Sequence, residues 1–163
     1  MVTPIVGAMC DRLQVLRVTT AAEMAEALAV RRRVFIEEQR VPEHEEIDAH
    51  DADPAMVADC LHVLARLDGA AIAAGRLLLQ PDADGRVHIG RVAVDAARRR
   101  SGVGRAVMLA LHDLARQQGS QRITLAAQTH AIGFYQRLGY GLRPGDVFLD
   151  AGIEHRWMDI ELR

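Results

Sequence analysis

The chain has 163 residues, half of them hydrophobic, with 22 acidic and 20 basic side chains and a formal net charge of −2. A chain of this size and composition can bury a full core without disulfides or metal, which predicts a single domain over residues 1–163. The nearly balanced charge argues against a protein that holds nucleic acid by general electrostatic attraction.

Cysteines and apolar runs indicate the compartment. Cys10 and Cys60 are too few for a disulfide framework and are not spaced as a metal site, so we expect ordinary thiols in a reducing compartment. No stretch approaches the roughly 20 apolar residues that a membrane span needs, and the N-terminus lacks the pattern of a signal peptide. The prediction is a cytoplasmic protein with no membrane or nucleic-acid partner.

The first half of the chain alternates between strand and helix patterns. Residues 13–18 alternate as a strand, and Thr20 with Glu23 then reads as a capping box. Apolar residues at helical spacing predict a first helix to about residue 38, which Pro42 ends. Residues 61–79 are two apolar runs around Asp68-Gly69, a pattern typical of a hairpin.

The second half continues this alternation. A strand is expected over residues 87–94, and an amphipathic helix follows the glycines at 102 and 104 and stops at Gly119. Residues 122–128 predict a strand, residues 131–140 a short helix closed by Gly139, and residues 147–162 a terminal hairpin. Such alternation is an α/β or α+β pattern.

An acidic run spans residues 43–54, with six carboxylates and no arginine. A run of this kind usually forms a solvated loop. The alternative is that it rims a binding site, where it would attract a cationic amine and repel acids. Its His and Asp/Glu spacing matches no defined metal site, so no metal is expected.

Three arginines, Arg98 to Arg100, stand directly before Gly102 and Gly104 at a strand-to-helix junction. The first turn of a helix offers unpaired N–H groups and the positive end of its dipole, and glycines allow close backbone approach. The junction therefore suits a polyanion such as a pyrophosphate. A P-loop would need lysine, which the chain lacks, and Val107 breaks the dinucleotide fingerprint. The alternative is a tight turn with a solvated arginine patch.

The stretch from Arg99 to Gly104 resembles the Arg/Gln-x-x-Gly-x-Gly/Ala motif of the GNAT superfamily of acyl-CoA N-acyltransferases. Residues 127–140 resemble a later segment of that family, and residues 31–48 with 148–158 resemble its bacterial ElaA-like branch. The resemblance implies an α+β fold in α/β/α layers. Its mixed central sheet is splayed between strands 4 and 5, with flanking helices.

The resemblance also implies a site for acetyl-CoA as cosubstrate. The loop before the helix would hold the pyrophosphate, and the fourth strand would pair its main chain with the pantetheine arm. Gly90 fits a bulge or close backbone approach in that strand, or is a strand defect. Many members have Asn where this chain has Gln128, so that contact departs from the pattern. The implied cofactor-binding residues are Val92, Ala93, Val94, Arg99, Arg100, Gly102, Val103, Gly104, Arg105, Gln128 and Tyr135.

In that family an amine attacks the thioester directly, which implies an acid and a base. An alkyl amine with a pKa near 10 is only about 0.1% neutral at pH 7, so proton removal matters. Tyr135 matches the tyrosine that protonates the departing thiolate, although it could simply fill the helix face. His88 is a candidate base, although a strand histidine is often structural. Glu38, with its neighbour Glu37, is a rival base or a solvated helix end.

Two functions follow from the resemblance. The first is an N-acetyltransferase that moves an acetyl group from acetyl-CoA to a primary amine of a small molecule or peptide. The alternative is a non-catalytic acyl-CoA-binding sensor or interaction module. A homodimer is left open, and fold likeness does not settle the acceptor.

Overall fold

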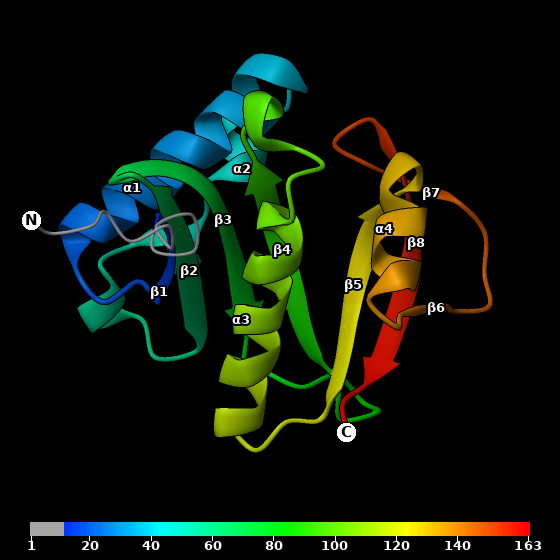
Figure 1. The fold of residues 1–163 in the computed structure, drawn as a ribbon. Coiled ribbons are helices and arrows are strands. Elements are labelled where there is room, and N and C mark those ends of the chain that lie inside the picture. Colours follow the sequence, from blue (N-terminus) through cyan, green and yellow to red (C-terminus); the bar gives the residue numbers. More distant parts are fainter. Residues whose placement is uncertain (1–11) are drawn as a thin grey trace, which may run out of the picture.

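The computed structural model describes residues 12–163 (Figure 1). Cys10 lies outside this range, and Cys60 is a buried free thiol. Within residues 12–163, no helix combines the length and the apolar character that a bilayer crossing requires.

One eight-stranded sheet runs through the molecule in the order β1-β2-β3-β4-β5-β8-β6, with β7 paired to β8. Every pair of neighbours is antiparallel except β4 and β5. The strands are β1 Leu13–Arg17, β2 Cys60–Leu67, β3 Ala70–Leu78, β4 Val87–Val94, β5 Arg122–Gln128, β6 Gly141–Leu142, β7 Phe148–Asp150 and β8 Ile153–Glu161.

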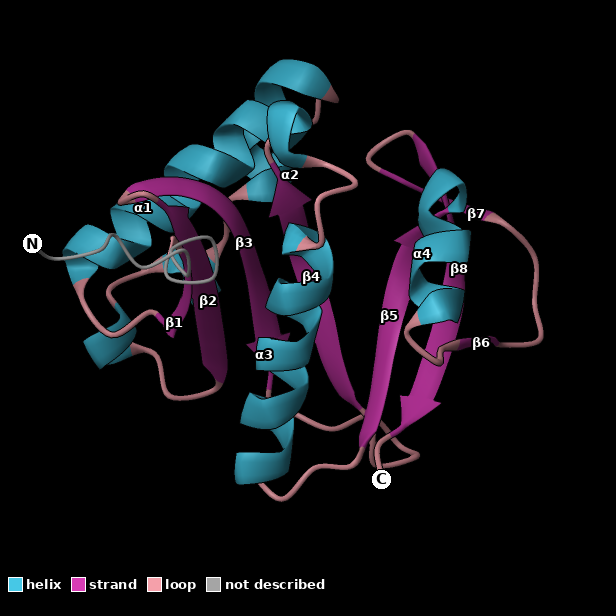
Figure 2. Ribbon diagram, in the orientation of Figure 1, coloured by secondary structure: helices cyan, strands magenta, loops and turns pink. Residues whose placement is uncertain are grey.

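Helices cover both faces of this sheet (Figure 2). Helix α1 packs on β2, β3 and β4 from one side, whereas α3 packs on the same strands from the other and α4 lies against β5. The α-helices are α1 Ala21–Arg31, α2 Glu43–Glu46, α3 Val103–Gln117 and α4 Ile132–Arg137. A π-helix, η1 Arg32–Glu38, follows α1, and the 3-10 helices are η2 Ala49–Asp51, η3 Pro54–Met56, η4 Ala96–Arg98 and η5 Thr129–Ala131.

Each face of the sheet has its own apolar core. The apolar stripe of α3, with Val107 and Leu111 fully buried, packs on Leu77 and Ile89 of the sheet. On the other face α1 buries Ala27 and Val30. Because strand side chains alternate between faces, one sheet serves both cores. The predicted α/β/α layers are confirmed.

The first helix begins as predicted and ends with a different geometry. The Glu23 amide donates to Thr20 Oγ1 at 3.1 Å and the Glu23 carboxylate accepts from the Thr20 amide at 3.2 Å, which is the predicted capping box. After Arg31 the helix continues to Glu38 as a π-helix, in which the Gln39 amide donates to the Val34 carbonyl. Each π-type hydrogen bond spans one residue more than an α-helical one, so the side chains after Arg31 point in different directions than in an α-helix. The spacing of apolar residues did not predict this change.

The predicted hairpin turn is also confirmed. Asp68 and Gly69 both have positive φ, 51° and 83°. Two consecutive positive φ values define the type I′ turn that matches the twist of paired strands.

The prediction of a solvated loop for residues 43–54 is wrong in part. Glu46 and Asp51 are buried, and both bind Arg31, which is only 1% exposed, at 2.7 and 2.5 Å. Asp51 also binds Arg76, which in turn binds Asp48 at 2.7 Å. Burial opposes ionisation of Asp51, but the hydrogen bond and charge of Arg31 outweigh it and lower the Asp51 pKa to about 2. The sequence gives no sign of these partners because they come from distant elements.

Candidate functional site

A gap opens in the middle of the sheet. Strands β4 and β5 pair only at Val87 with Ile123 and at His88 with Thr124. Beyond these two pairs the strands diverge (Figure 1). A cavity of about 1170 Å³ lies between them and is lined by both strands, by η1, α2 and α4, and by the start of α3. The predicted splay between the fourth and fifth strands is therefore confirmed.

A bulge in β4 accounts for the divergence. Gly90 pairs with Arg76 and Ala93 pairs with Ala74, so Arg91 and Val92 together face the single residue Gly75. Arg91 has φ +54°, in the left-handed region. Because a bulge bends its strand and increases the local twist, it turns β4 away from β5. The sequence pointed to Gly90, and the bulge begins at the next residue.

The side chain of Arg91 is fixed by the acidic segment. Its Nε lies 3.0 Å from Glu46 Oε2 and donates to the Glu46 carbonyl at 3.1 Å, while Nη2 donates to the Glu45 carbonyl. Burial and the nearby charge of Arg76 lower the pKa of Arg91. A non-glycine residue at positive φ costs on the order of 1 kcal/mol or more, so these contacts hold a strained residue at the cavity wall.

One end of the cavity is the start of α3. Gly102 is the N-cap with φ +87°, and no described side chain caps this end. In the first backbone hydrogen bond of the helix, the Ala106 amide donates to the Gly102 carbonyl at 3.0 Å. The amides before Ala106 are therefore free to face an anion, with the positive end of the helix dipole behind them.

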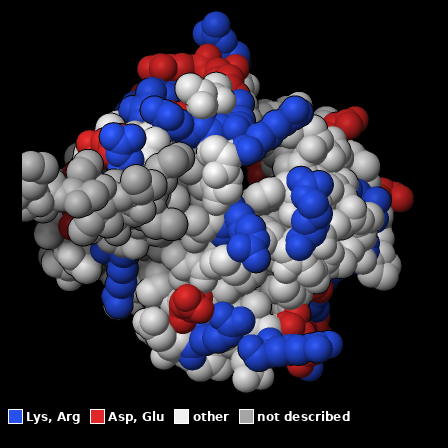
Figure 3. Space-filling view, viewed as in Figure 1, with Lys and Arg blue, Asp and Glu red and all other residues white. Residues whose placement is uncertain are grey.

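Arginines surround this end, which we call the basic end. Figure 3 shows basic side chains gathered beside the hollow between the two halves of the molecule. Arg137, on α4, was missed because it carries no part of the glycine motif. The side chains of Ala93 and Val103 are buried in the cores, so only their main chains could meet a ligand. The basic end is lined by Arg99, Arg100, Arg105 and Arg137.

Glu38 lies on the basic side of the cavity. Arg99 Nη2 donates to Glu38 Oε1 at 2.9 Å, and Arg99 Nη1 lies 2.7 Å from Glu38 Oε2, while Arg99 Nε donates to the Val94 carbonyl. This contact links η1 to the loop before α3. The Glu38 carboxylate is therefore paired with the Arg99 guanidinium, in the loop before α3.

Gly104 faces Phe134 of α4 across the cavity. A Cβ built there would lie 3.3 Å from Phe134 Cζ and 3.6 Å from Val94 Cγ2. At Gly102, by contrast, a Cβ would meet nothing within 4 Å. The two glycines thus serve different needs, since Gly102 supplies a left-handed backbone and Gly104 supplies space.

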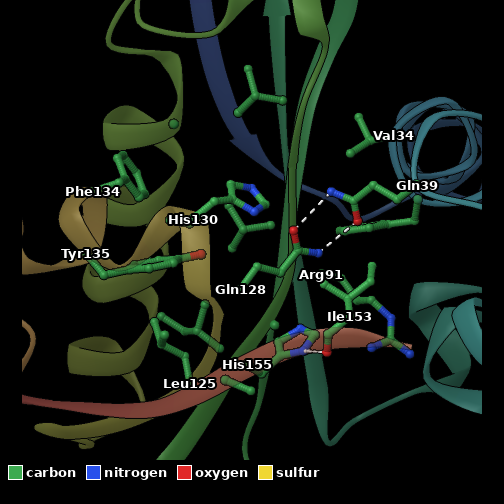
Figure 4. Close-up of a pocket in the computed structure, with 18 of the residues that line it drawn as sticks. Val34, Gln39, Arg91, Leu125, Gln128, His130, Phe134, Tyr135, Ile153 and His155 are labelled. Carbon is green, nitrogen blue, oxygen red and sulfur yellow. Dashed lines mark hydrogen bonds between the residues drawn. The ribbon is translucent and has the colours of Figure 1, made fainter. Parts of the chain in front are cut away.

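Tyr135 reaches the cavity from α4. Figure 4 shows its hydroxyl pointing into the open space. Its ring packs edge-on against Phe134 and Tyr140, and burial raises the pKa of Tyr135 to about 12. The phenol therefore keeps its proton at neutral pH and can donate it.

His88 lies on β4, at the last residue that pairs with β5. Burial, together with the charges of Arg76 and Arg91, lowers its pKa below 6.5. The imidazole is therefore neutral at pH 7 and can accept a proton. The rings of His88 and Trp157 are nearly perpendicular, with their centroids 5.8 Å apart.

Gln128 is bound to another residue. Its side-chain amide donates to Gln39 Oε1 at 2.8 Å and its oxygen accepts from Gln39 Nε2 at 3.1 Å (Figure 4). This pair joins the end of η1 to the end of β5 across the cavity. The sequence could not indicate Gln39, because it is 89 residues away in the chain.

Comparison with known proteins identifies the family to which this fold belongs. The sequence profile of the Acetyltransferase (GNAT) family matches residues 22–140. The chain belongs to the GNAT family. It is 35% identical over 136 residues to the uncharacterized N-acetyltransferase YjcF of Bacillus subtilis. The matched region covers 83% of this chain and 91% of YjcF.

Solved GNAT structures agree. An acyl-CoA N-acyltransferase from Pseudomonas aeruginosa is 31% identical, with a TM-score of 0.76, over 91% of this chain and 99% of that one. Escherichia coli ElaA is 27% identical with the same TM-score and the same coverage of both chains. The chain is thus an acyltransferase of the GNAT fold, and the predicted likeness to ElaA is confirmed.

Proposed function

We propose that this GNAT protein transfers the acetyl group of acetyl-CoA to a primary amine of a small molecule or peptide. One observation carries the proposal. The cavity between the parted strands β4 and β5 leads directly to the uncapped start of α3 and its arginines. A thioester on a long arm with a pyrophosphate at its far end matches that shape and charge.

The described residues fit such a cosubstrate. The amides of Gly102, Val103, Gly104 and Arg105, with Arg99 and Arg100, would hold the pyrophosphate. The free edge of β4 over Val92, Ala93 and Val94 would accept the pantetheine arm as an added strand. Because Gln128 is bound to Gln39, it would reach the arm only if that pair opens.

Tyr135 and His88 suit two of the proton transfers. The amine nitrogen attacks the thioester carbonyl, and the carbon–sulfur bond then breaks. Tyr135, whose pKa of about 12 keeps it protonated, supplies the proton to the departing sulfur. A bound ammonium must lose one proton before attack and a second after it. Neutral His88 takes the first, directly or through water, and the second passes to water. Glu38 is less suited to this role, because Arg99 holds its carboxylate.

Two measurements test the proposal. Calorimetry should show binding of coenzyme A, and a panel of primary amines should release free thiol from acetyl-CoA in the presence of the protein. Binding without turnover on any amine would favour the acyl-CoA sensor instead. Absence of binding would refute both.

A further inference from the structure

Four ring side chains line a part of the cavity away from the basic end, and we call it the aromatic end. Phe148 stacks on Trp157 at 5.2 Å and on His155 at 5.8 Å, with 23° between the planes in both cases. Strand register explains the cluster, since His155 pairs with Phe148 on one side and with Gln128 on the other. The aromatic end consists of His88, Phe148, His155 and Trp157.

These rings are not packed under a helix. Helix α1 packs on β2, β3 and β4, and its apolar core meets the second half of the sheet at Ala151 and Ile153 and not at Phe148 or Trp157. Trp157 is 38% exposed although it belongs to a central strand of the second half of the sheet. Stacked aromatic surface that stays in contact with water inside a cavity is typical of a ligand site.

Unpaired carboxylates distinguish this end from the basic end, because the arginine that lines the cavity near His88, Arg91, is already paired with Glu46. Glu45 and Asp150 line the cavity from α2 and β7, and both are exposed. Neither carboxylate has a salt-bridge partner among residues 12–163, in contrast to Glu38 and Glu46. Free carboxylates beside aromatic rings favour a cationic ligand over an acid.

We infer that the acceptor is a primary amine joined by a short chain to an aromatic ring. The ring extends the stack of Phe148 and Trp157, and the ammonium group enters between the carboxylates and loses its proton toward His88. This inference rests on the proposed acetyl transfer, and it specifies the acceptor class.

The experiment uses the only tryptophan in the sequence, Trp157, as the reporter. Its fluorescence is titrated with 2-phenylethylamine and with 2-cyclohexylethylamine in protein saturated with coenzyme A. The two amines have the same carbon skeleton and charge and differ in the aromaticity of the ring. We expect 2-phenylethylamine to bind about 2- to 12-fold tighter, as one aromatic pair predicts. Equal affinities would overturn the inference.

Two variants locate the effect. Phe148→Leu should abolish the preference for the aromatic amine. Leu149→Ala, next in β7 and 70% exposed, should preserve it. A preference that survives Phe148→Leu unchanged would also overturn the inference.

Turnover separates this inference from the proposed function. Acetyl transfer to both amines with equal kcat/KM would refute the aromatic acceptor and leave acetyl transfer standing. A binding preference without thiol release from any amine would refute acetyl transfer and leave the aromatic end as an amine-binding site.

Discussion

At the scale of residues, the two candidate proton-transfer groups approach the gap from different faces of the sheet. Tyr135 belongs to the side of α3 and α4, whereas His88 lies on the side of Trp157. In the proposed reaction, a gap through the sheet would let an amine enter from one face while a thiolate leaves on the other. Direct transfer needs no covalent intermediate on the protein in this arrangement.

Tyr135→Phe should lower kcat by roughly 10- to 1000-fold, because the departing thiolate loses its proton donor. Calorimetry should find nearly unchanged affinity for coenzyme A. The matched control is Tyr140→Phe, since Tyr140 is buried and bonded to His112 at 2.7 Å. That control should lower stability by about 1 kcal/mol while keeping kcat. Equal kcat in Tyr135→Phe and the natural protein would exclude the acid role.

His88→Gln tests the base through the pH dependence of kcat/KM. Burial and two arginines lower the His88 pKa, so protonation in the folded protein requires a pH below 6.5. Activity of the natural protein should therefore fall as the pH drops through a value below 6.5. His88→Gln should remove that acidic limb and lower the plateau. If the acidic limb persists in the variant, another group is the base.

What the sequence predicts at this scale depends on whether a residue acts within a motif. Tyr135, Gly102 and Gly104 belong to contiguous motifs, and all three line the predicted cavity. Arg91 and Gln39 could not be found, because their importance comes from partners 45 and 89 residues away. Long-range pairs of this kind leave no local pattern.

At the scale of elements, the acidic segment from α2 to η2 is anchored beside the cavity by the buried arginines Arg31 and Arg76. Asp51→Asn removes the negative charge that pairs with Arg31, whose side chain is buried and only 1% exposed. Leaving a buried charge undercompensated should cost about 3–5 kcal/mol in urea denaturation. Glu26→Gln, in the more exposed pair with Arg66, should cost at most about 1 kcal/mol. Similar losses in the two variants would contradict this view of the network.

Substitutions of Gly104 test the contact between α3 and α4 across the cavity. A valine there would press on Phe134, which is already 3.3 Å from the position of a Cβ, and would enter the space in front of the first-turn amides. We expect Gly104→Val to weaken binding of coenzyme A by about tenfold or more and Gly104→Ala to have a smaller effect. Calorimetry measures both, and a thermal melt verifies folding. Unchanged affinity in the valine variant would argue against this cradle.

The elements themselves were largely predictable. Strand alternation, the capping box and the glycines that end α3 and α4 are local signals, and each appears near its expected place. The π-helix η1 was missed because its apolar spacing differs little from that of an α-helix. The two-residue strand β6 is too short for any alternation to show.

At the scale of the whole molecule, the sheet is two halves that share only two residue pairs of β4 and β5. The resemblance to GNAT proteins predicted this gap, whereas composition and periodicity could not, because they do not report which strands part. Side-chain pairs add further links between the halves, among them Gln39 with Gln128 and His112 with Tyr140.

A bound coenzyme should protect the inner edge of β4. Backbone amides of β4 that face the gap should exchange with deuterium quickly in the free protein. With coenzyme A at about 100 times its dissociation constant, their exchange should slow by about 100-fold, the factor set by mass action. Amides of the β2–β3 hairpin should already exchange slowly without ligand. Fast exchange at β4 under saturating coenzyme would contradict the added-strand geometry.

The bulge at Arg91 and Val92 has a consequence for solubility. A sheet that parts in its middle exposes two more strand borders, and such borders invite foreign chains to attach and start aggregates. The bulge breaks the regular spacing of hydrogen-bonding groups on β4, and a half-buried arginine, Arg91, stands at the break. A long extended chain therefore finds no continuous ladder to join. The distortion that opens the sheet for a ligand also guards it against self-association.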